Sequence, residues 1–444
     1  MKKAVRLTAL AIALLLALTS CSNGEGQNSQ TDGTETVSAF EQDPEKVEGN
    51  VVWWYWDEPG ARLMWDEFNK TYPNVTLEVV PVVNADYVKK IQTAVSSGTE
   101  LPDILCAEMD WRGKILSYDI WEDLEAAPYN LETDKIMDYD LPLLRNQQGQ
   151  ICGLDNVITA SGMAYKADLA KEYFGTDDPD EMKELLPDWE TFAQKGKEVY
   201  EQSGGKVFML TGFQDAGRMV FNQHPDPLVE DGKLINFDKV IVPTLETLLM
   251  LKENNCCDMI DQWTPAWNAS FAESSHIFYP APAWALSFVI KPNDPNGEGN
   301  WRVMEAPGGG YNYGGTMFGI SKSSDVKEAA WAFLHWSTMT DEGAKAYRDT
   351  QDFFVPRKDL YGGDNFDFSG REDPYFGGQN VNELLYKVIP EGLETRPNNI
   401  YDGSITEVLL LTEKLIEKDE AVTLESACQY FKDELTNKEP DLMG

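Results

Sequence analysis

The spacing of apolar positions predicts alternating strands and helices over residues 51–105. Residues 51–56 are all β-branched or aromatic, which is typical of a buried strand. Apolar side chains then recur at helical spacing, at Leu63, Met64 and Phe68. A second strand is expected over 75–83, a helix over 87–95 and a third strand over 101–105. This order of elements predicts an α/β fold with a largely parallel sheet.

A second series of helices and strands is predicted after about residue 160. A strand is expected over 280–290, interrupted by Pro282. Glycines at 308–310 and 314–315 mark flexible crossings of the chain. The length of 444 residues favours two or three domains. The expected helices are 189–200, 242–252, 325–339, 406–418 and 424–435.

The N-terminus carries the pattern of an export signal. A basic segment precedes an apolar run from about 7 to 18, which is shorter than the ~20 residues that span a bilayer. The small residues directly before Cys21 resemble the lipobox of bacterial lipoproteins. That resemblance implies a signal peptide over 1–20, a lipid on the Cys21 thiol, and an extracytoplasmic protein that is lipid-anchored to the cell membrane. An ordinary signal peptide followed by an unrelated cysteine is the alternative.

Composition limits the partners of the chain. Residues 21–48 are mostly small and polar, and they predict a flexible linker after Cys21. The formal net charge of −38 disfavours nucleic acid and anionic lipid as partners. No later apolar run reaches membrane length, so the acyl chain would be the only membrane attachment. The five further cysteines are odd in number and lack disulfide spacing, and we expect thiols, mostly buried.

Metal-binding patterns are weak in this sequence. Its three histidines are far apart and show no zinc spacing with the cysteines. Five residues fall at positions 1, 3, 5, 6 and 12 of the calcium-loop pattern, namely Asp294, Asn296, Glu298, Gly299 and Glu305. Position 5 is a glutamate, however, and the flanking segments are predicted as strands. We therefore expect no metal site and no cofactor.

Five segments carry a resemblance to a known family through their order and spacing. They are 53–75 with its ending Tyr72-Pro73-Asn74-Val75, 97–104 with Pro102-Asp103-Ile104, 149–169, 306–334 and 340–358. Together they resemble the family 1 extracellular solute-binding proteins, the carbohydrate-capturing subunits of bacterial ABC importers with a maltose-binding-protein-like fold. Departures from the family pattern at Cys152, Asp155 and Lys166 bear on the subfamily and the ligand.

The resemblance implies two α/β lobes with a ligand cleft between them, as in type II periplasmic binding proteins. The chain would cross between lobes near 157–162, 304–312 and 337–345. Lobe one would comprise 49–158 plus 306–338, and lobe two 159–305 plus 339–444. The protein would act as a monomer without catalysis. It would close over a mono- or oligosaccharide and deliver it to the permease subunits of an ABC importer.

Candidate ligand contacts follow from the chemistry of sugars. Trp and Tyr faces match the C–H patches of a pyranose, while carboxylates and amides bind its hydroxyls. Trp56, Asp57 and Glu58 follow the first strand, where open α/β sheets bind ligands. Asp110 and Trp111 follow the third strand in the same way, and the family resemblance implies a sugar-contacting acid there.

Further candidates lie in the second half of the chain and at the crossings. Trp284 matches a position where the family often stacks an aromatic on the sugar. The others are Ser161 at the first crossing, Phe213 and Gln214 after an apolar strand, Tyr311 and Tyr313 beside glycines, and Tyr401 and Asp402 at the start of a late helix. Trp263, Trp267, Trp331 and Trp336 are interpreted as packing residues.

Two other functions stay open on the sequence alone. A surface glycoside hydrolase needs two carboxylates ~5–9 Å apart, and the many acids of this chain do not exclude such a pair. Motifs of serine hydrolases, zinc proteases and phosphate-binding loops are absent from the sequence. A binding protein for a polyamine or a peptide would also use Trp and Asp, through cation–π contacts and ion pairs.

Overall fold

The computed structural model describes residues 40–41, 43–361 and 371–443. The chain divides into two units, Met1–Ser38 and Ala39–Gly444, and only the second is described here. The predicted signal peptide, Cys21 and most of the predicted linker lie outside the described residues. Within the described part of the chain, no helix has the length and apolar character that a membrane crossing needs.

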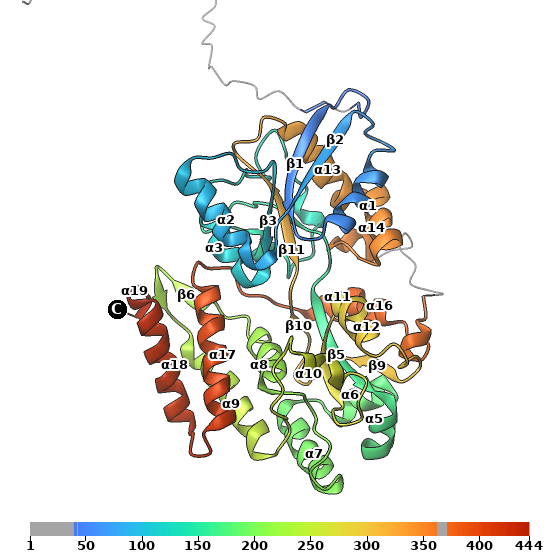
Figure 1. Cartoon of the computed structure of the whole chain (residues 1–444), viewed down its shortest axis with the longest axis vertical. Helices are drawn as coiled ribbons and strands as arrows, with labels where there is room; N and C mark the ends of the chain where they lie inside the picture. Colours follow the sequence, from blue (N-terminus) through green and yellow to red (C-terminus); the bar gives the residue numbers. More distant parts are fainter. Residues whose placement is uncertain (1–39, 42, 362–370, 444) are drawn as a thin grey trace, which may run out of the picture. The chain divides into compact units, whose positions relative to one another are not determined.

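The first sheet has the strand order β2-β1-β3-β11-β4 (Figure 1). Strand β1 pairs in parallel with β2 and β3, whereas β11 runs antiparallel to β3 and β4. The strand–helix–strand pattern of the sequence is confirmed, because each buried run lies in this sheet. The strands are β1 (Gly49–Tyr55), β2 (Val75–Pro81), β3 (Ile104–Glu108), β4 (Leu154–Asp155) and β11 (Thr316–Ile320).

Four helices pack with the first sheet, namely α1 (Glu58–Phe68), α2 (Asn84–Ser97), α13 (Lys327–Met339) and α14 (Asp341–Gln351). Asp57 caps α1 by accepting a hydrogen bond from the Gly60 N–H at 3.1 Å. Gly98 ends α2 in the left-handed conformation, at φ 65°. Shorter helical turns complete this part at Met109–Trp111, Arg112–Leu116 (α3), Thr133–Lys135, Leu141–Leu144 (α4) and Lys358–Tyr361 (α15).

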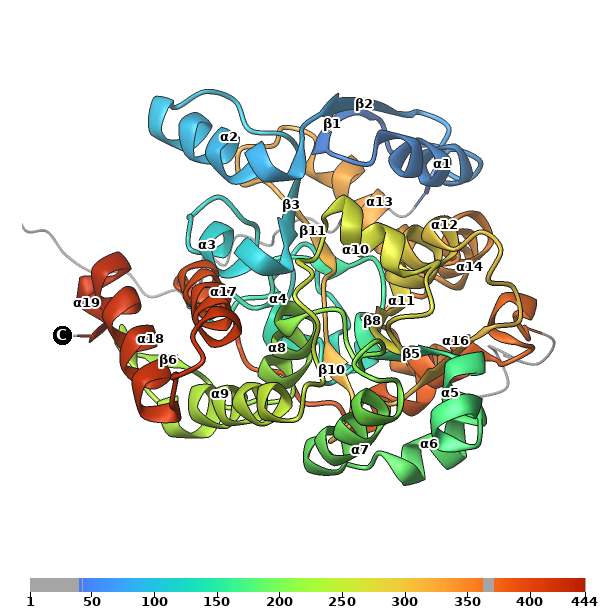
Figure 2. The same ribbon diagram turned by 60° about the horizontal axis from the view of Figure 1, so that its bottom comes forward.

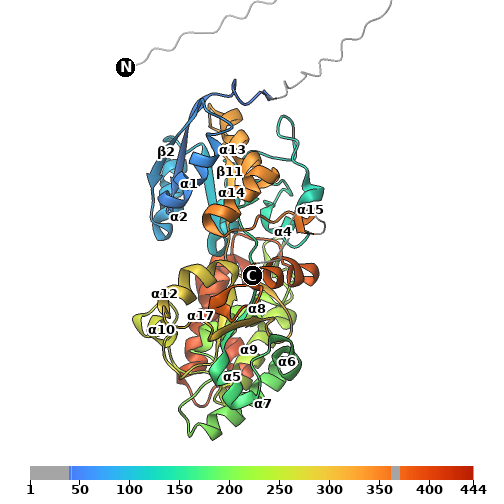
Figure 3. The ribbon, with the colours of Figure 1, turned by 90° about the vertical axis from the view of Figure 1, so that its right-hand side faces the viewer.

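Helix α14 lies with the first sheet, although the sequence suggested that the chain leaves this lobe near 337–345. Thr340 links α13 to α14, and α14 packs against both α13 and α1 (Figure 3). Its buried residues, such as Ala344 and Tyr347, belong to the first core. The apolar face of α14 therefore packs with the first lobe, although α14 follows residue 338, where that lobe was expected to end. The lobe ranges otherwise stay a prediction.

The second sheet has the order β10-β5-β8, with β9 also paired to β5. Its strands are β5 (Ala160–Lys166), β8 (Phe278–Pro282), β9 (Trp301–Met304) and β10 (Tyr311–Asn312), all antiparallel to β5. A separate hairpin is formed by β6 (Val229–Glu230) and β7 (Lys233–Leu234). The second sheet and its helices supply the second lobe, and the α/β class is confirmed.

The strand expected over 280–290 is wrong beyond Pro282. Strand β8 ends there, and the chain continues as α11 (Ala283–Ala285), a π-helical turn (Leu286–Ile290) and α12 (Lys291–Asn293). Proline has no N–H for a strand ladder, and a short apolar run fits a buried helix as well as a strand. Trp284 consequently lies on a helical turn.

The remaining helices belong mostly to the second lobe. Helices α9, α17 and α18 pack side by side (Figure 2). The set comprises α5 (Ala167–Phe174), α6 (Pro179–Leu185), α7 (Trp189–Gln202), α8 (Phe213–Asn222), α9 (Phe237–Glu253), α10 (Pro265–Ser270), α16 (Val381–Glu383), α17 (Asp402–Lys418), α18 (Leu424–Lys438) and α19 (Pro440–Met443), with turns Pro374–Phe376, Leu384–Val388 and Pro390–Gly392.

The chain passes between the two sheets at two places that matter for the site. It crosses from β4 to β5 through residues 156–159, and returns from β10 to β11 through 313–315. Gly314 and Gly315 have φ angles of 82° and 101°, which favour glycine. The expected first crossing, 157–162, overlaps residues 156–159, and the expected second crossing, 304–312, lies before 313–315.

The predicted linker ends before residue 48. The Phe40 ring lies 5.4 Å from that of Tyr129, and Val47 is buried in the first core. These apolar side chains therefore already belong to the folded body. The described cysteines are all free, and four of the five are buried, as expected.

Candidate functional site

An ion pair joins the two lobes beside the crossings. Asp110 lies in the turn after β3, and its Oδ1 accepts a hydrogen bond from Arg218 Nη1 of α8 at 2.8 Å. The Arg218 guanidinium also lies 4.9 Å from the centre of the Tyr313 ring, which follows β10. Burial alone would lower the pKa of Arg218, but the charge of Asp110 raises it above its ordinary value. Arg218 is therefore held as a cation between a carboxylate and an aromatic face.

A carboxyl group with a raised pKa adjoins this pair. Glu108 ends β3, and its side chain accepts a hydrogen bond from the Asp110 N–H at 3.0 Å. Burial, followed by the charge of Asp110, raises the pKa of Glu108 to about 8. Glu108 therefore holds its proton more strongly than an exposed glutamate does.

A cavity of about 50 Å³ lies next to the ion pair, lined by both lobes. Asp110 and Asp402, two of the predicted site residues, contribute to its wall. The lining residues are Met109, Asp110, Leu143, Arg218, Phe221, Asn222, Asn312, Thr395, Arg396, Pro397, Asn398, Asp402 and Thr406. Ligand pockets usually measure ~300–1,000 Å³, so this cavity is too small for a saccharide in this arrangement.

Residues 395–399, here called the strap, connect the lobes on one side of the cavity. The Asn398 amide donates to the Leu143 carbonyl of the first lobe at 2.5 Å. Arg396 donates to the carbonyls of Phe221 and His224 in the second lobe, at 2.9 and 2.8 Å. Burial lowers the pKa of Arg396 to about 10. The strap thus presents a second cation to the cavity and fixes it through main-chain oxygens.

Asp402 begins α17 next to the strap. Its Oδ2 accepts a hydrogen bond from the Asn399 N–H at 2.7 Å, and its other oxygen accepts from the Asn399 amide. Burial raises the pKa of Asp402 to about 6, partly offset by these hydrogen bonds and by Arg396. The carboxylate therefore lies at the cavity wall with part of its hydrogen-bonding capacity already used.

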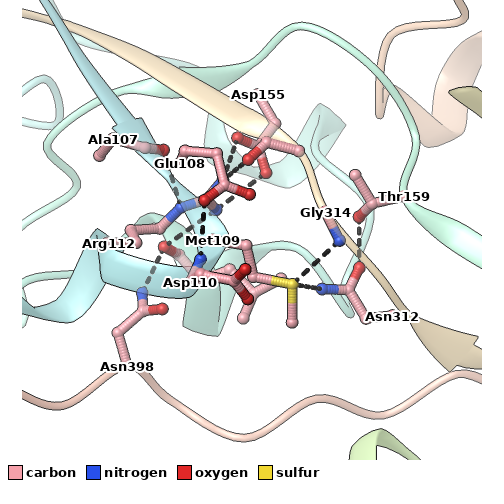
Figure 4. A network of polar contacts seen from close by, with 12 residues as sticks. Ala107, Glu108, Met109, Asp110, Arg112, Asp155, Thr159, Asn312, Gly314 and Asn398 are labelled. Atoms are coloured by element: carbon pink, nitrogen blue, oxygen red, sulfur yellow. Dashed lines mark hydrogen bonds and ion pairs between the residues drawn. The ribbon is translucent and has the colours of Figure 1, made fainter. Parts of the chain in front are cut away.

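A buried polar network holds the crossings to the end of β3 (Figure 4). Arg112 forms two hydrogen bonds with the Asp155 carboxylate, at 2.8 and 2.9 Å, and donates to the Gly315 carbonyl at 3.1 Å. The sulfur of Met109 accepts from the Asn312 amide at 3.4 Å and from the Gly314 N–H at 3.1 Å. Residues 109 and 110 are thereby placed relative to both crossings.

An aromatic row extends from the ion pair along the second lobe. The Trp284 ring lies 5.6 Å from that of Tyr313, and its Nε1 donates to the Tyr313 carbonyl at 3.0 Å. A Cβ atom at Gly314 would approach Trp284 Nε1 to 2.6 Å, so the glycine makes room for the indole. Trp263 stacks on Trp284 with ring centres 6.2 Å apart and planes 15° apart. The row therefore runs Arg218, Tyr313, Trp284, Trp263.

Trp263 packs against the ring of Trp267, 5.1 Å away, as well as against Trp284, but unlike the other predicted packing residues it is largely exposed. Its side chain is 59% exposed, whereas Trp267, Trp331 and Trp336 are buried as expected. Its position in a polar loop, between Gln262 and Thr264, was the available signal for an exposed ring.

A second aromatic group lies at the carboxyl edge of the first sheet. Trp56 is half-buried, with its ring centre 5.7 Å from Tyr87 and 6.1 Å from Trp111. Trp111 stacks on Tyr87 at 5.3 Å, and its Nε1 donates to Asn84 Oδ1 at 3.3 Å. The structure thus brings the predicted residues Trp56 and Trp111 together.

Asp57 and Glu58 are engaged in local structure. Asp57 caps α1, and Glu58 pairs with Arg62 on the same helix at 2.7 Å. Ligand contacts by either acid stay a prediction.

Several predicted residues are buried and bonded within the protein. The Ser161 hydroxyl donates to the Thr159 carbonyl at 2.9 Å, and the Tyr311 hydroxyl donates to the Gly162 carbonyl at 3.0 Å. Phe213 belongs to the second core. Burial explains why these side chains have no exposed surface to offer a ligand in this arrangement.

Two other predicted residues are half-buried near the site. Gln214 accepts a hydrogen bond from the Gln262 N–H at 2.9 Å, and Tyr401 packs against the second core just before α17. Ligand contacts by these residues stay a prediction.

Sequence reasoning missed the polar residues that come from helices and from the strap. Arg218 and Asn222 are four residues apart on α8, and Asp402 and Thr406 are four residues apart on α17. Such pairs share one helix face, so that polar i, i+4 pairs on otherwise apolar helices were an available signal. Arg396 had no comparable signal, because only the tertiary fold brings the strap to α8.

The calcium-like residues are engaged within the protein. Asp294 accepts a hydrogen bond from Trp301 Nε1 at 2.9 Å, and Glu305 pairs with Lys183. In the described part of the chain, no three His, Cys, Asp or Glu side chains are grouped as metal ligands would be.

Comparison with known proteins shows which proteins share this fold. The sequence profile of the bacterial extracellular solute-binding proteins matches residues 64–367. No protein of the curated set matches the chain. A crystal structure of an extracellular solute-binding protein of family 1 has 20% identity and a TM-score of 0.78, covering 87% of this chain and 99% of that one.

Two further solved structures are similar over most of their length. The sugar-binding protein MalE of Xanthomonas citri has 17% identity and a TM-score of 0.69, covering 88% of this chain and 98% of that one. An ABC transporter-associated binding protein of B. animalis subsp. lactis, in complex with β-1,6-galactobiose, has 17% identity and a TM-score of 0.66, covering 89% and 99%. These likenesses confirm the predicted two-lobe fold.

Proposed function

The chain belongs to the bacterial extracellular solute-binding proteins, and from this membership we propose that it captures a carbohydrate between its lobes and delivers it to the permease of an ABC importer. It is no enzyme in this proposal, because it binds its ligand reversibly and leaves it chemically unchanged. The mono- or oligosaccharide would lie along the row from Arg218 to Trp263. Membrane attachment through a lipidated Cys21 is part of the same proposal.

The aromatic row beside the Arg218–Asp110 pair is the observation that carries the proposal. Trp284 is half-buried and offers a flat apolar face for the C–H patches of a pyranose, whereas Tyr313 is 7% exposed under Arg218 and offers its ring only when the site opens. Arg218 and Asp110 offer a donor and an acceptor for its hydroxyls within the same site. Aromatic faces with convergent polar groups are what a neutral, polyhydroxylated ligand requires. Structural relatives that hold sugars, such as the β-1,6-galactobiose complex, support this choice of ligand class.

The cavity is too small for a saccharide in this arrangement, and a hinge motion of the lobes would open it. Opening separates α8 from the turn after β3 and breaks the Arg218–Asp110 pair, and closing around the sugar restores contacts between the lobes. The buried network at Met109 and Arg112 lies at the crossings, so it can persist while the rest of the cleft opens. A ligand that contacts both lobes then favours the closed arrangement through its differential affinity.

A polyamine is the second candidate, and the charges at the site disfavour it. A polyamine site needs carboxylates without nearby cations. Asp110 is paired with Arg218, and Asp402 lies near Arg396, whose charge lowers the carboxyl pKa. The cations already present would repel a polycation.

A thermal-shift panel tests the proposal. The probes are glucose, galactose, maltose, maltotriose, β-1,6-galactobiose, lacto-N-biose, spermidine and a tripeptide. At ~100 Kd a ligand adds about 2.7 kcal/mol to the free energy of unfolding, which raises Tm by a few degrees. At least one sugar should raise Tm while spermidine and the peptide do not. A Tm rise with spermidine or the peptide alone would contradict the proposal.

A further inference from the structure

We propose that Trp263 is the outer stacking platform of the ligand site, and that the ligand is a saccharide of at least two rings. The inference rests on the proposed carbohydrate function and narrows it. Its evidence is the exposure of Trp263, its backbone conformation, the loop that holds it and its place in the aromatic row.

The exposure and backbone of Trp263 are unusual for a tryptophan. Its side chain is 59% exposed, and its φ angle of 62° lies in the left-handed region. Bulky residues rarely adopt this conformation, and residues in such conformations persist where the surrounding structure holds them. Glycine or asparagine would meet the backbone requirement with less strain. The turn alone therefore does not explain the indole.

The loop of residues 258–263 is fixed to the start of α8. The Ile260 N–H donates to the Thr211 carbonyl at 3.0 Å. The Gln262 N–H donates to Gln214 Oε1 at 2.9 Å, and the Gln262 amide donates to Asp215 Oδ1 at 2.6 Å. Helix α8 also carries Arg218. The same helix thus positions the ion pair at one end of the row and Trp263 at the other.

The geometry of the row suits consecutive sugar rings. Trp263 and Trp284 are nearly parallel, with planes 15° apart, and Trp284 adjoins Tyr313. A ring bound beside Arg218 and Tyr313 would occupy the inner part of the row. A second ring, joined through one glycosidic oxygen, would reach the exposed indole of Trp263. A monosaccharide would leave this indole in solvent.

A protein-docking role is the competing account of an exposed apolar loop. Met259 in the same loop is 65% exposed, and such a surface could contact another protein. The docking account gives no reason for Trp263 to stack on Trp284, which lies in the ligand row. The stacking therefore favours the sugar as the occupant.

Calorimetric titration of full-length protein tests the inference. The probe pairs are β-1,6-galactobiose with galactose and maltose with glucose. For the pair that binds wild type, Trp263→Ala should weaken the disaccharide about tenfold and change the monosaccharide less than twofold. Met259→Ala, an equally exposed change in the same loop, should alter neither. Trp263→Phe should recover part of the disaccharide affinity.

A second variant separates ring loss from misfolding. Trp263→Asn removes the ring and suits the left-handed backbone, so it should melt no lower than wild type and still lose disaccharide affinity. If the Trp263 variants lost affinity equally for disaccharide and monosaccharide, or for neither, Trp263 would not be a stacking platform. The proposed carbohydrate function would be unaffected by that result. Wild type that binds no sugar of the thermal-shift panel would count against both the platform and the carbohydrate function.

Discussion

Arg218 Nη1 lies 2.8 Å from Asp110 Oδ1, and this one contact ties helix α8 of the second lobe to the end of β3 in the first. The Asp110 side chain is 47% exposed, so the pair contributes little to folding, ~0–1 kcal/mol as surface pairs do. The pair matters because it connects the two lobes, which have to separate when the site opens. The ion pair therefore favours the closed arrangement more than it favours the fold.

Asp110→Asn should weaken sugar binding about three- to tenfold, because the closed arrangement loses its ionic link and a carboxylate acceptor. The Tm without ligand should stay within a few degrees of wild type. Calorimetric titration with the best sugar measures the affinity. Glu125→Gln is the matched control, since it breaks an Arg–carboxylate pair with Arg145 within the first lobe. Unchanged affinity in Asp110→Asn would show that the ion pair does not contribute to sugar binding.

Trp284→Ala should reduce affinity by about tenfold or more, because a stacked indole contributes ~1–3 kcal/mol through buried area and ring geometry. Trp54→Ala provides the comparison, since Trp54 is a half-buried tryptophan of β1 that lies under Lys90 at 4.0 Å. Quenching of tryptophan fluorescence on titration gives both affinities. Equal affinities for the two variants would show that Trp284 does not contact the sugar.

Gly314→Ala should weaken sugar binding through Trp284. The added methyl would lie 2.6 Å from Trp284 Nε1 and displace the indole. Gly98→Ala is matched in backbone strain, since both glycines have positive φ, but a Cβ at Gly98 has no described heavy atom within 4 Å. Both variants should lose ~1 kcal/mol of unfolding free energy from backbone strain, Gly314→Ala should lose more because it displaces the indole, and only Gly314→Ala should lose affinity. Urea unfolding and calorimetric titration measure the two effects, and parallel affinity losses would contradict the assignment.

Glu413 should make the protein less stable as pH rises. Burial raises its pKa to about 8 from the ordinary 4.5, despite Arg218 and Lys414 nearby, and Asp215 adds to the rise. Between pH 5 and 8 the folded state therefore binds more protons than the unfolded state, and the unfolding free energy falls by up to ~1.4 kcal/mol per pH unit from this group.

Glu413→Gln should flatten that slope in urea unfolding at pH 5, 6, 7 and 8. Glu407→Gln changes a 58% exposed glutamate of the same helix and should leave the slope as in wild type. A slope that is identical in wild type and Glu413→Gln would mean that Glu413 titrates alike in both states.

Local patterns predicted the elements better than they predicted their packing. Residues 51–56 are β-branched and aromatic, and β1 lies there because burial and strand preference agree. The run after Pro282 is apolar without a clear period, and its helical state depends on neighbours that the sequence does not display. Helix α14 was predicted for the second lobe, yet its partners α1 and α13 are set by the tertiary fold.

In the candidate site, too, local patterns predicted some residues, whereas others depend on the tertiary fold. Asp110 and Tyr313 were predicted because they follow a strand or lie at a crossing, where α/β folds place ligands, and Trp284 was predicted from the family resemblance. Arg396 was missed because its closeness to α8 arises only after the strap crosses between the lobes. Trp263 was missed because an indole in a tryptophan-rich chain is usually a core residue, and its exposure depends on the loop held by Gln262.

Isothermal titration calorimetry of the sugar panel, followed by chromatography of the recovered sugar, tests the central claim most directly. The account predicts that at least one saccharide binds with a stoichiometry of one per chain and is recovered unchanged. Absence of binding to every sugar, or recovery of hydrolysed products, would contradict the account of a carbohydrate-binding protein.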